Sequence, residues 1–445
     1  MTAASATGTA TQASRPLSVE EVFEISRSRE VALARLLTTY IVTGLVFMLL
    51  PGTFLGVWNL LTISTRHAGD SVSPAWVQAH GHAQIFGWIG TFILGIGFYS
   101  IPKLRRGNAF MLSFAWICWG LWTGGVALRW FSNIYQWHWR WFLPVSAALE
   151  LCAFLMFFRI VSGHRPQGSS KPRLEEWICT VMAASAGFLL SLVVNLGATA
   201  YVALRGVSPA FPANFDQRYL VLSTWGFLVP FVWGFSAKWL PVFLGLRSLR
   251  ARWLLLAVTG NAVGVVAALT GLTRAASVFL LGGILGACFS LRLFEPTQQA
   301  AKVRGVHASF PIFVRAAYIW AIVAAGLGMW AVLEGNAQGI WGASRHALTV
   351  GFLATMVFCI GQRVLPAFSG MRLLFSTKLM FAGLLLLTAG CVLRVSSEIV
   401  AYQGYGSWAW SWLPVSAVSE MAGVTIFALN LLLTFASPPT VPAKV

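Results

Sequence analysis

Two histidines of this sequence occur inside long apolar runs, where ionisable side chains are rare. His82 lies near the start of the run from Ala79 to Pro102, and His346 opens another run that ends at Pro366. A neutral imidazole is a good ligand for haem iron, and an ionisable group inside a membrane is a functional candidate by default. We therefore expect His82 and His346 to hold one haem iron; the alternative is two hydrogen-bonded histidines at helix interfaces.

The spacing around these histidines is repeated. Three apolar runs end in a proline and carry a glycine 15 residues earlier, and the pairs are Gly87 with Pro102, Gly226 with Pro241, and Gly351 with Pro366. His82 and His346 each lie 20 residues before their proline, whereas the middle run has Val221 there. One element thus occurs three times, and Gly87 and Gly351 are expected to let a flat cofactor or a helix approach closely.

Three further residues could take part in chemistry. His80 is two residues from His82, about 200° around a helix, so the two cannot point at the same centre. His80 is expected to bind a second metal or a haem propionate, or to lie at the membrane interface. Glu150 and Glu420 fall near the middle of predicted spans, where a lone carboxylate is protonated or paired. They are candidates for a proton relay or for metal binding, with structural pairing to a nearby arginine or serine as the alternative.

The elements that carry these residues are membrane helices. The chain has 445 residues, of which 57% are hydrophobic and 10% charged, against about 25% charged in soluble domains. About twelve apolar runs are long enough to cross a bilayer as helices. They lie near 33–51, 75–101, 110–128, 141–161, 177–204, 219–241, 253–271, 275–292, 309–333, 346–366, 377–395 and 410–435. Only helices and closed barrels satisfy backbone groups in lipid, and the runs lack the alternation of strands.

A second match extends the repeat. The fourth span begins with the motif Leu-Pro-Val-Ser-Ala, and the proline of this motif lies six residues before Glu150. The twelfth span begins with the same motif, and its proline lies six residues before Glu420. We therefore predict three parallel four-helix units, at about 31–162, 177–293 and 308–435, inside one membrane domain of residues 31–435. Residues 1–30 and 436–445 are expected to be cytoplasmic tails.

The net charge of +18 does not indicate nucleic-acid binding, because basic residues gather in alternate loops. The clusters are Lys103, Arg105 and Arg106; Arg159, Arg165, Lys171 and Arg173; Arg247, Arg250 and Arg252; and Lys302 with Arg304. This is the positive-inside pattern of a multi-pass protein with both termini in the cytoplasm.

Three four-helix units with histidines on spans 2 and 10 resemble subunit I of the haem-copper oxidases. The segment HGHAQIFGWIGTFILG is similar to the second helix of cbb-type oxidases and nitric oxide reductases, and RHALTVGFLATM followed by RVLP resembles the NnrS family. The resemblance implies a b-type haem between His82 and His346, possible copper, a bacterial inner-membrane location, a quinol or cytochrome c donor, and partner subunits.

The sequence departs from these oxidases at the reaction centre. They keep three histidines on helices 6 and 7 and a second histidine on helix 10. Here the sixth and seventh spans have none, and the tenth has only His346. The resemblance therefore implies a degenerate, NnrS-like protein that acts in nitric oxide response or electron transfer, and not a complete terminal oxidase. The alternatives are a secondary transporter that uses Glu150 and Glu420, or a scaffold subunit without a cofactor.

Overall fold

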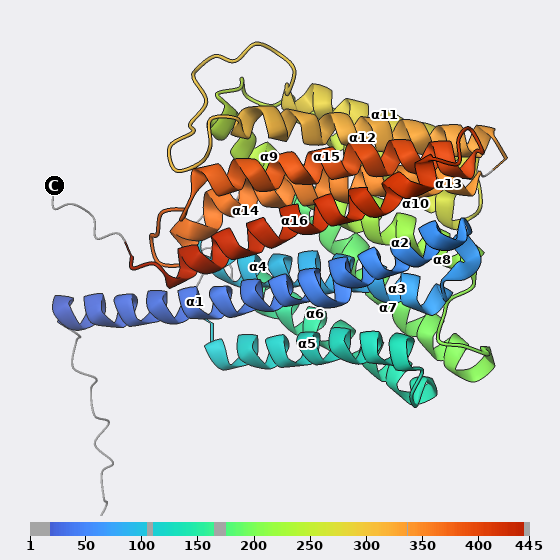
Figure 1. Ribbon diagram of the computed structural model, residues 1–445. Helices are drawn as coiled ribbons and strands as arrows, with labels where there is room; N and C mark the ends of the chain where they lie inside the picture. Colours follow the sequence, from blue (N-terminus) through green and yellow to red (C-terminus); the bar gives the residue numbers. More distant parts are fainter. Residues whose placement is uncertain (1–17, 105–109, 164–174, 336, 440–445) are drawn as a thin grey trace, which may run out of the picture.

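The fold is a bundle of long helices that run roughly along one direction (Figure 1). The computed structural model describes residues 18–104, 110–163, 175–335 and 337–439, and this part contains no β-strand. Several predicted features lie outside the described residues: most of the N-terminal tail, the basic residues Arg105, Arg106, Arg165, Lys171 and Arg173, and the last six residues.

The helices form three successive units, as the repeats predict. The first comprises α1 (Val19–Phe47), η1 (Met48–Phe54), α2 (Leu55–Arg66), η2 (Gly69–Ser71), α3 (Pro74–His82), η3 (Ala83–Gly90), α4 (Thr91–Leu104), α5 (Leu112–Tyr135) and α6 (Trp139–Ser162). The second comprises α7 (Glu176–Arg205), α8 (Ala213–Val221), η4 (Leu222–Leu228), α9 (Val229–Leu244), α10 (Ala251–Leu269) and α11 (Thr273–Leu291). The third comprises α12 (Phe310–Leu333), α13 (Gln338–His346), η5 (Ala347–Ala354), α14 (Thr355–Phe368), α15 (Thr377–Tyr402) and α16 (Ala409–Ala436).

Eleven helical segments of the described part are long and apolar enough to cross a membrane. The remaining predicted span, the third in the chain, is α5, which has 24 residues. Its four tryptophans, together with Arg129 and Asn133, lower its mean hydropathy. The helix of the tenth span begins at Gln338 and not at residue 346, where the span was predicted to begin. His346 is therefore further from the helix end than the apolar run alone indicates.

The units close into a ring. In each unit the third and fourth spans pack together, as α5 with α6, α10 with α11, and α15 with α16. Neighbouring units meet where α6 contacts α7, α11 contacts α12, and α16 returns to α2. The second span of each unit lies inside this ring: 72% of its apolar window is buried, against 33–50% for the other spans.

Each second span contains a π-helical segment in the same register. The segments η3, η4 and η5 all begin 19 residues before the repeat proline (102 − 83, 241 − 222 and 366 − 347). A π turn leaves a backbone carbonyl without its usual partner. Thr91 and Thr355, which follow η3 and η5, donate hydroxyl hydrogen bonds to the carbonyls of Gly87 and Val350. The repeat seen in the sequence is thus a repeated backbone distortion.

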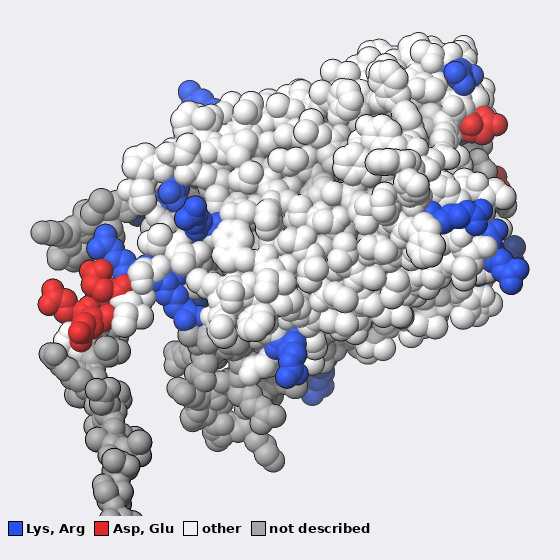
Figure 2. Space-filling view, turned by 90° about the horizontal axis from the view of Figure 1, so that it is seen from below, with Lys and Arg blue, Asp and Glu red and all other residues white. Residues whose placement is uncertain are grey.

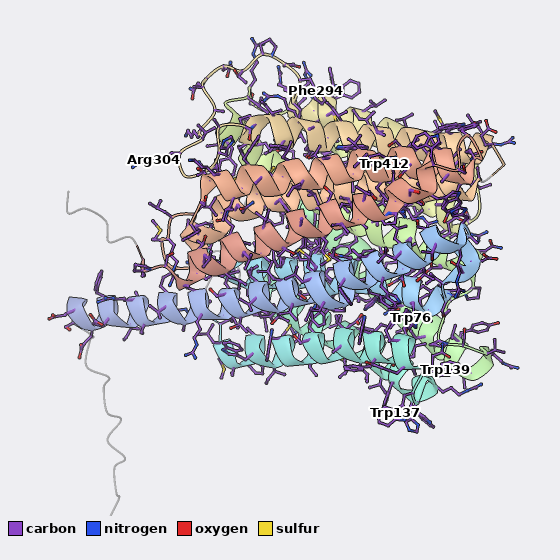
Figure 3. All side chains as sticks on the ribbon, in the orientation of Figure 1. Trp76, Trp137, Trp139, Phe294, Arg304 and Trp412 are labelled. Atoms are coloured by element: carbon purple, nitrogen blue, oxygen red, sulfur yellow. The ribbon has the colours of Figure 1, made fainter. Side chains whose placement is uncertain are left out.

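The ends of the bundle differ in composition. The helix α1 begins and α16 ends at the same end of the bundle (Figure 1), which we call the tail end. Trp76, Trp137 and Trp139 lie at the opposite end (Figure 3), which we call the tryptophan end. Charged residues gather at the two ends, with an uncharged band between them (Figure 2). This band suits contact with lipid hydrocarbon.

Candidate functional site

His82 is buried and faces the fourth span of its own unit. Its Nε2 atom is 2.8 Å from Oε1 of Glu150, and the two side chains are 5% and 0% exposed. The ring of Phe86, one turn further along the helix, stacks on the imidazole with 4.7 Å between centroids. His82 and Glu150, both predicted as site residues, therefore form one buried pair.

His80 points the other way, towards the first span. Its Nδ1 atom lies 2.9 Å from the carbonyl oxygen of Gly52, inside the π-helical segment η1. Because a carbonyl only accepts, Nδ1 carries the proton and Nε2 is left as the basic nitrogen. This is the usual arrangement of a metal-binding histidine, whose second nitrogen is fixed by a carbonyl or carboxylate. Gly56 makes room for the ring, since a Cβ there would lie 2.6 Å from its Cε1.

The structure brings His346 near His80. His346 interacts electrostatically with His80, Arg394 and Arg345. Both imidazoles lie deep in the bundle but are only half-buried, so each keeps accessible surface in the interior. In the described part of the chain, the ring of His346 has no hydrogen bond. The backbone carbonyl of His346 accepts a hydrogen bond from the thiol of Cys391. This electrostatic interaction favours His80, and not His82, as the span-2 partner of His346.

The ring of three units explains this pairing. His82 and His346 are equivalent by register but belong to different units, so they lie at different interfaces of the ring. His82 is bonded to Glu150 on α6, and His346 interacts electrostatically with Arg394 on α15. His80, about 200° around the helix from His82, reaches the interface between the third and first units.

A second cluster of charges surrounds His346. Arg394 forms an ion pair with Glu398, at 3.4 Å between Nη2 and Oε2. Glu420 interacts electrostatically with both. Within the described residues, Glu420 Oε1 and the Nε and Nη1 atoms of Arg394 are buried without hydrogen-bond partners. Glu420 thus lies beside Arg394, as the structural alternative expects, but the polar groups here are not all satisfied.

Some site residues were not predicted from the sequence. Glu398 follows Arg394 by four residues, and this spacing on a helix could have identified the pair. No sequence pattern identified Gly52, because its role is to offer a backbone carbonyl from a distorted turn that contains Pro51.

The predicted glycines take part in helix packing. A Cβ at Gly87 would lie 3.0 Å from Phe47 and Val126, and one at Gly351 would lie 2.6 Å from Trp320. These glycines let neighbouring helices approach, which is one of their two expected roles. Close approach of a flat cofactor at Gly87 and Gly351 stays a prediction.

The donor set fits a haem held by two imidazoles. His80 presents Nε2 with its tautomer fixed, and His346 has an unengaged ring. The unpartnered guanidinium atoms of Arg394 suit a propionate carboxylate. Among the described residues, no group of three or more His, Cys, Asp or Glu side chains could hold a metal ion, so copper binding and a second metal at His80 stay predictions.

Comparison with known proteins supports the fold. Residues 242–434 match a family described as a domain of unknown function, DUF8744. No curated protein matches the chain. Among solved structures, a heme-copper terminal oxidase dimer determined by cryo-EM is similar, with a TM-score of 0.67 and 11% sequence identity over 93% of this chain and 86% of that chain. At this identity the similarity shows the fold alone. The chain has an oxidase-like membrane fold, as predicted.

Proposed function

We propose that this protein binds a b-type haem between spans 2 and 10, and that His80 and His346 would hold its iron. The observation that carries the proposal is that these two imidazoles, from different units of the ring, interact electrostatically in the interior. The anchored Nδ1 of His80 supports it further. The proposal replaces His82 by His80 in the predicted pair and keeps the two helices.

Two imidazole ligands determine the chemistry that such a group would supply. A haem held by two imidazoles would supply electron transfer and would leave no position on the iron open for a gas. The Gly52 carbonyl fixes the orientation of His80, and the positive charges of Arg394 and Arg345 near His346 would balance the propionates. Electron transfer is therefore the activity best supported by these residues.

The finer parts of the proposal rest on the resemblance. A role in nitric oxide response, of the NnrS type, accords with the two predicted motifs. The donor would be a quinol or a cytochrome c, partner subunits would bind the bundle, and the protein would lie in a bacterial inner membrane with the tail end in the cytoplasm. The similarity to a heme-copper terminal oxidase supports the membrane location and the oxidase-like class.

An absorption spectrum of the purified full chain tests the proposal. The wild type should show the Soret and sharp reduced bands of a low-spin haem. His80→Ala and His346→Ala should lose them, whereas His82→Gln, which keeps a hydrogen-bond donor for Glu150, should retain them. Loss in His82→Gln with retention in His80→Ala would restore His82 as the ligand. A colourless wild type would leave a transporter or a scaffold subunit.

A further inference from the structure

A separate polar cluster lies between the first and second units. It consists of Glu150 on α6, Arg129 on α5 and Tyr219 on α8, with His82 bonded to Glu150. The three side chains are buried, with 0%, 2% and 5% relative exposure. They interact electrostatically with one another, so they share one region of the interior.

The members of this cluster face one another without direct hydrogen bonds. In the described part of the chain, Glu150 Oε2, Arg129 Nε and Nη1, and the Tyr219 hydroxyl are buried and have no hydrogen-bond partner. Buried polar atoms in native proteins are almost always satisfied, by protein or by ordered water. Unbonded donors and acceptors from three helices that share one buried region form the surroundings in which an internal water makes two to four hydrogen bonds.

The cluster is connected to the tryptophan end of the bundle by a series of charged groups. Arg129 interacts with Asp216, which is half-buried, and Asp216 interacts with Arg345, which is exposed. The ring of Phe211 lies 4.6 Å from the Arg129 guanidinium and supports it from one side. Polarity therefore extends from the surface at Arg345 to the interior at Glu150, and exposure falls along the way.

Towards the tail end the cluster is closed by aromatic rings. Phe86 is one turn beyond His82, and its ring lies 6.1 Å from Phe188 and 6.2 Å from Phe227. Phe188 stacks on Phe227 at 3.8 Å and contacts Phe154 at 4.5 Å. All four rings are at most 1% exposed. They offer no hydrogen-bonding group through which water could continue.

We propose that Arg129, Glu150 and Tyr219 bind internal water that is open to the tryptophan end at Asp216 and stops at the phenylalanine cluster. The site is a solvent half-channel, and it supplies Glu150 with protons from that end only. The proposal does not depend on haem binding, because Arg129, Glu150, Tyr219 and Asp216 are not assigned to the His80–His346 site, and Arg345, which interacts with both His346 and Asp216, marks only the surface end of the route.

Radiolytic footprinting of the full chain in detergent tests the water. Hydroxyl radicals made in place from water oxidise the aromatic side chains next to it, even buried ones. Tyr219 should be oxidised at least about tenfold faster than Tyr40. Tyr40 is the matched control, since it is fully buried and its hydroxyl is bonded to the Ala115 carbonyl. Equal protection of both tyrosines would overturn the proposal.

A pair of variants tests the mouth of the channel. Asp216→Leu should reduce Tyr219 oxidation towards the rate of Tyr40. Arg218→Leu, on the same helix but exposed, should leave it unchanged. The rate at Tyr40 reports in both variants whether the fold is intact. If both variants change Tyr219 equally, or neither does, the route through Asp216 is wrong.

Deuterium exchange tests the protons. In protein labelled with 15N-histidine, the signal that disappears in His82→Gln identifies the proton shared by His82 and Glu150. This proton should exchange in heavy water orders of magnitude faster than core amides, and Asp216→Leu should slow it at least about tenfold. Exchange as slow as that of the core amides in the wild type would refute the half-channel.

Discussion

Gly125 lies directly against Glu150. A Cβ built on the glycine would be 2.8 Å from the glutamate Cγ and 2.9 Å from the carbonyl oxygen of Ser146. The third unit repeats this relationship, because a Cβ on Gly390 would be 2.6 Å from Cγ of Glu420 and 3.0 Å from the Ser416 carbonyl. In both units an intramembrane glutamate is accommodated by a glycine on the preceding span.

Gly125→Ala is therefore expected to destabilise the protein by about 1–3 kcal/mol, since the added methyl group meets backbone atoms that cannot move aside. Gly124→Ala is the matched control, because nothing lies within 4 Å of its built Cβ. Thermal unfolding of the purified chain measures both. Equal melting temperatures of the two variants would contradict the close packing of α5 against α6.

Gly56 offers a test of His80 that leaves the histidine in place. An alanine Cβ there would overlap the imidazole and push Nδ1 away from the Gly52 carbonyl. Loss of such an orienting contact costs about 10–100-fold in metal affinity, so Gly56→Ala should lower the haem affinity by at least about tenfold. The measurement is haem titration followed by absorbance.

Gly81→Ala is the control for this experiment. Gly81 lies between the two histidines, and its built Cβ meets nothing within 4 Å. Haem affinity in this variant should equal that of the wild type. Unchanged affinity in Gly56→Ala as well would separate His80 from the haem.

The sequence predicted how deep the site residues lie along their helices, but not which neighbouring helices their side chains face. The proline spacing placed His82 and His346 at one depth, and the three π-helical segments follow the same register. Equal depth suggested a shared ligand, whereas in a ring of three units equivalent residues face different interfaces. His80, and not His82, interacts electrostatically with His346, because His80 lies on the opposite face of its helix from His82.

Other parts of the site depend on contacts that no local pattern encodes. The Gly52 carbonyl is available because a π turn occurs at Pro51 in the first span, and Asp216 reaches Arg129 from the second unit. Such contacts arise only when distant helices pack. By contrast, the pairing of each third span with its fourth was accessible from the repeat, since short connections make neighbours antiparallel.

A hydrogen-bonded junction at the tail end provides a further prediction. Asn430 donates to Gln362 at 2.7 Å and to the Ser376 carbonyl at 2.9 Å, and its Oδ1 accepts from the Ser376 amide. Asn430→Leu should destabilise the protein by about 1–3 kcal/mol, because buried partners lose their bonds.

Asn195→Leu is the comparison for this variant. Asn195 is equally buried, but neither of its side-chain polar atoms has a hydrogen-bond partner among the described residues. Its replacement by leucine should leave the melting temperature unchanged or raise it. A similar loss of stability in both variants would show that Asn195 is satisfied by bound water.

Acidity should weaken the contact between α7 and α9 at the tail end. The hydrogen bonds from Lys238 and then Trp177 hold the pKa of Glu175 below its usual value of 4.5. A lowered pKa in the folded protein stabilises it above the unfolded value, and this contribution is lost as the pH falls below about 4.5 through the folded value. Glu175→Gln should thus lower the melting temperature at neutral pH and leave it unchanged at low pH. The effect at neutral pH should be small, because solvent screens the carboxylate. Glu176→Gln, whose side chain has no hydrogen bond or ion pair among the described contacts, is the control for the loss of a neighbouring carboxylate. A difference for Glu175→Gln that persists at low pH would show that its effect is not electrostatic.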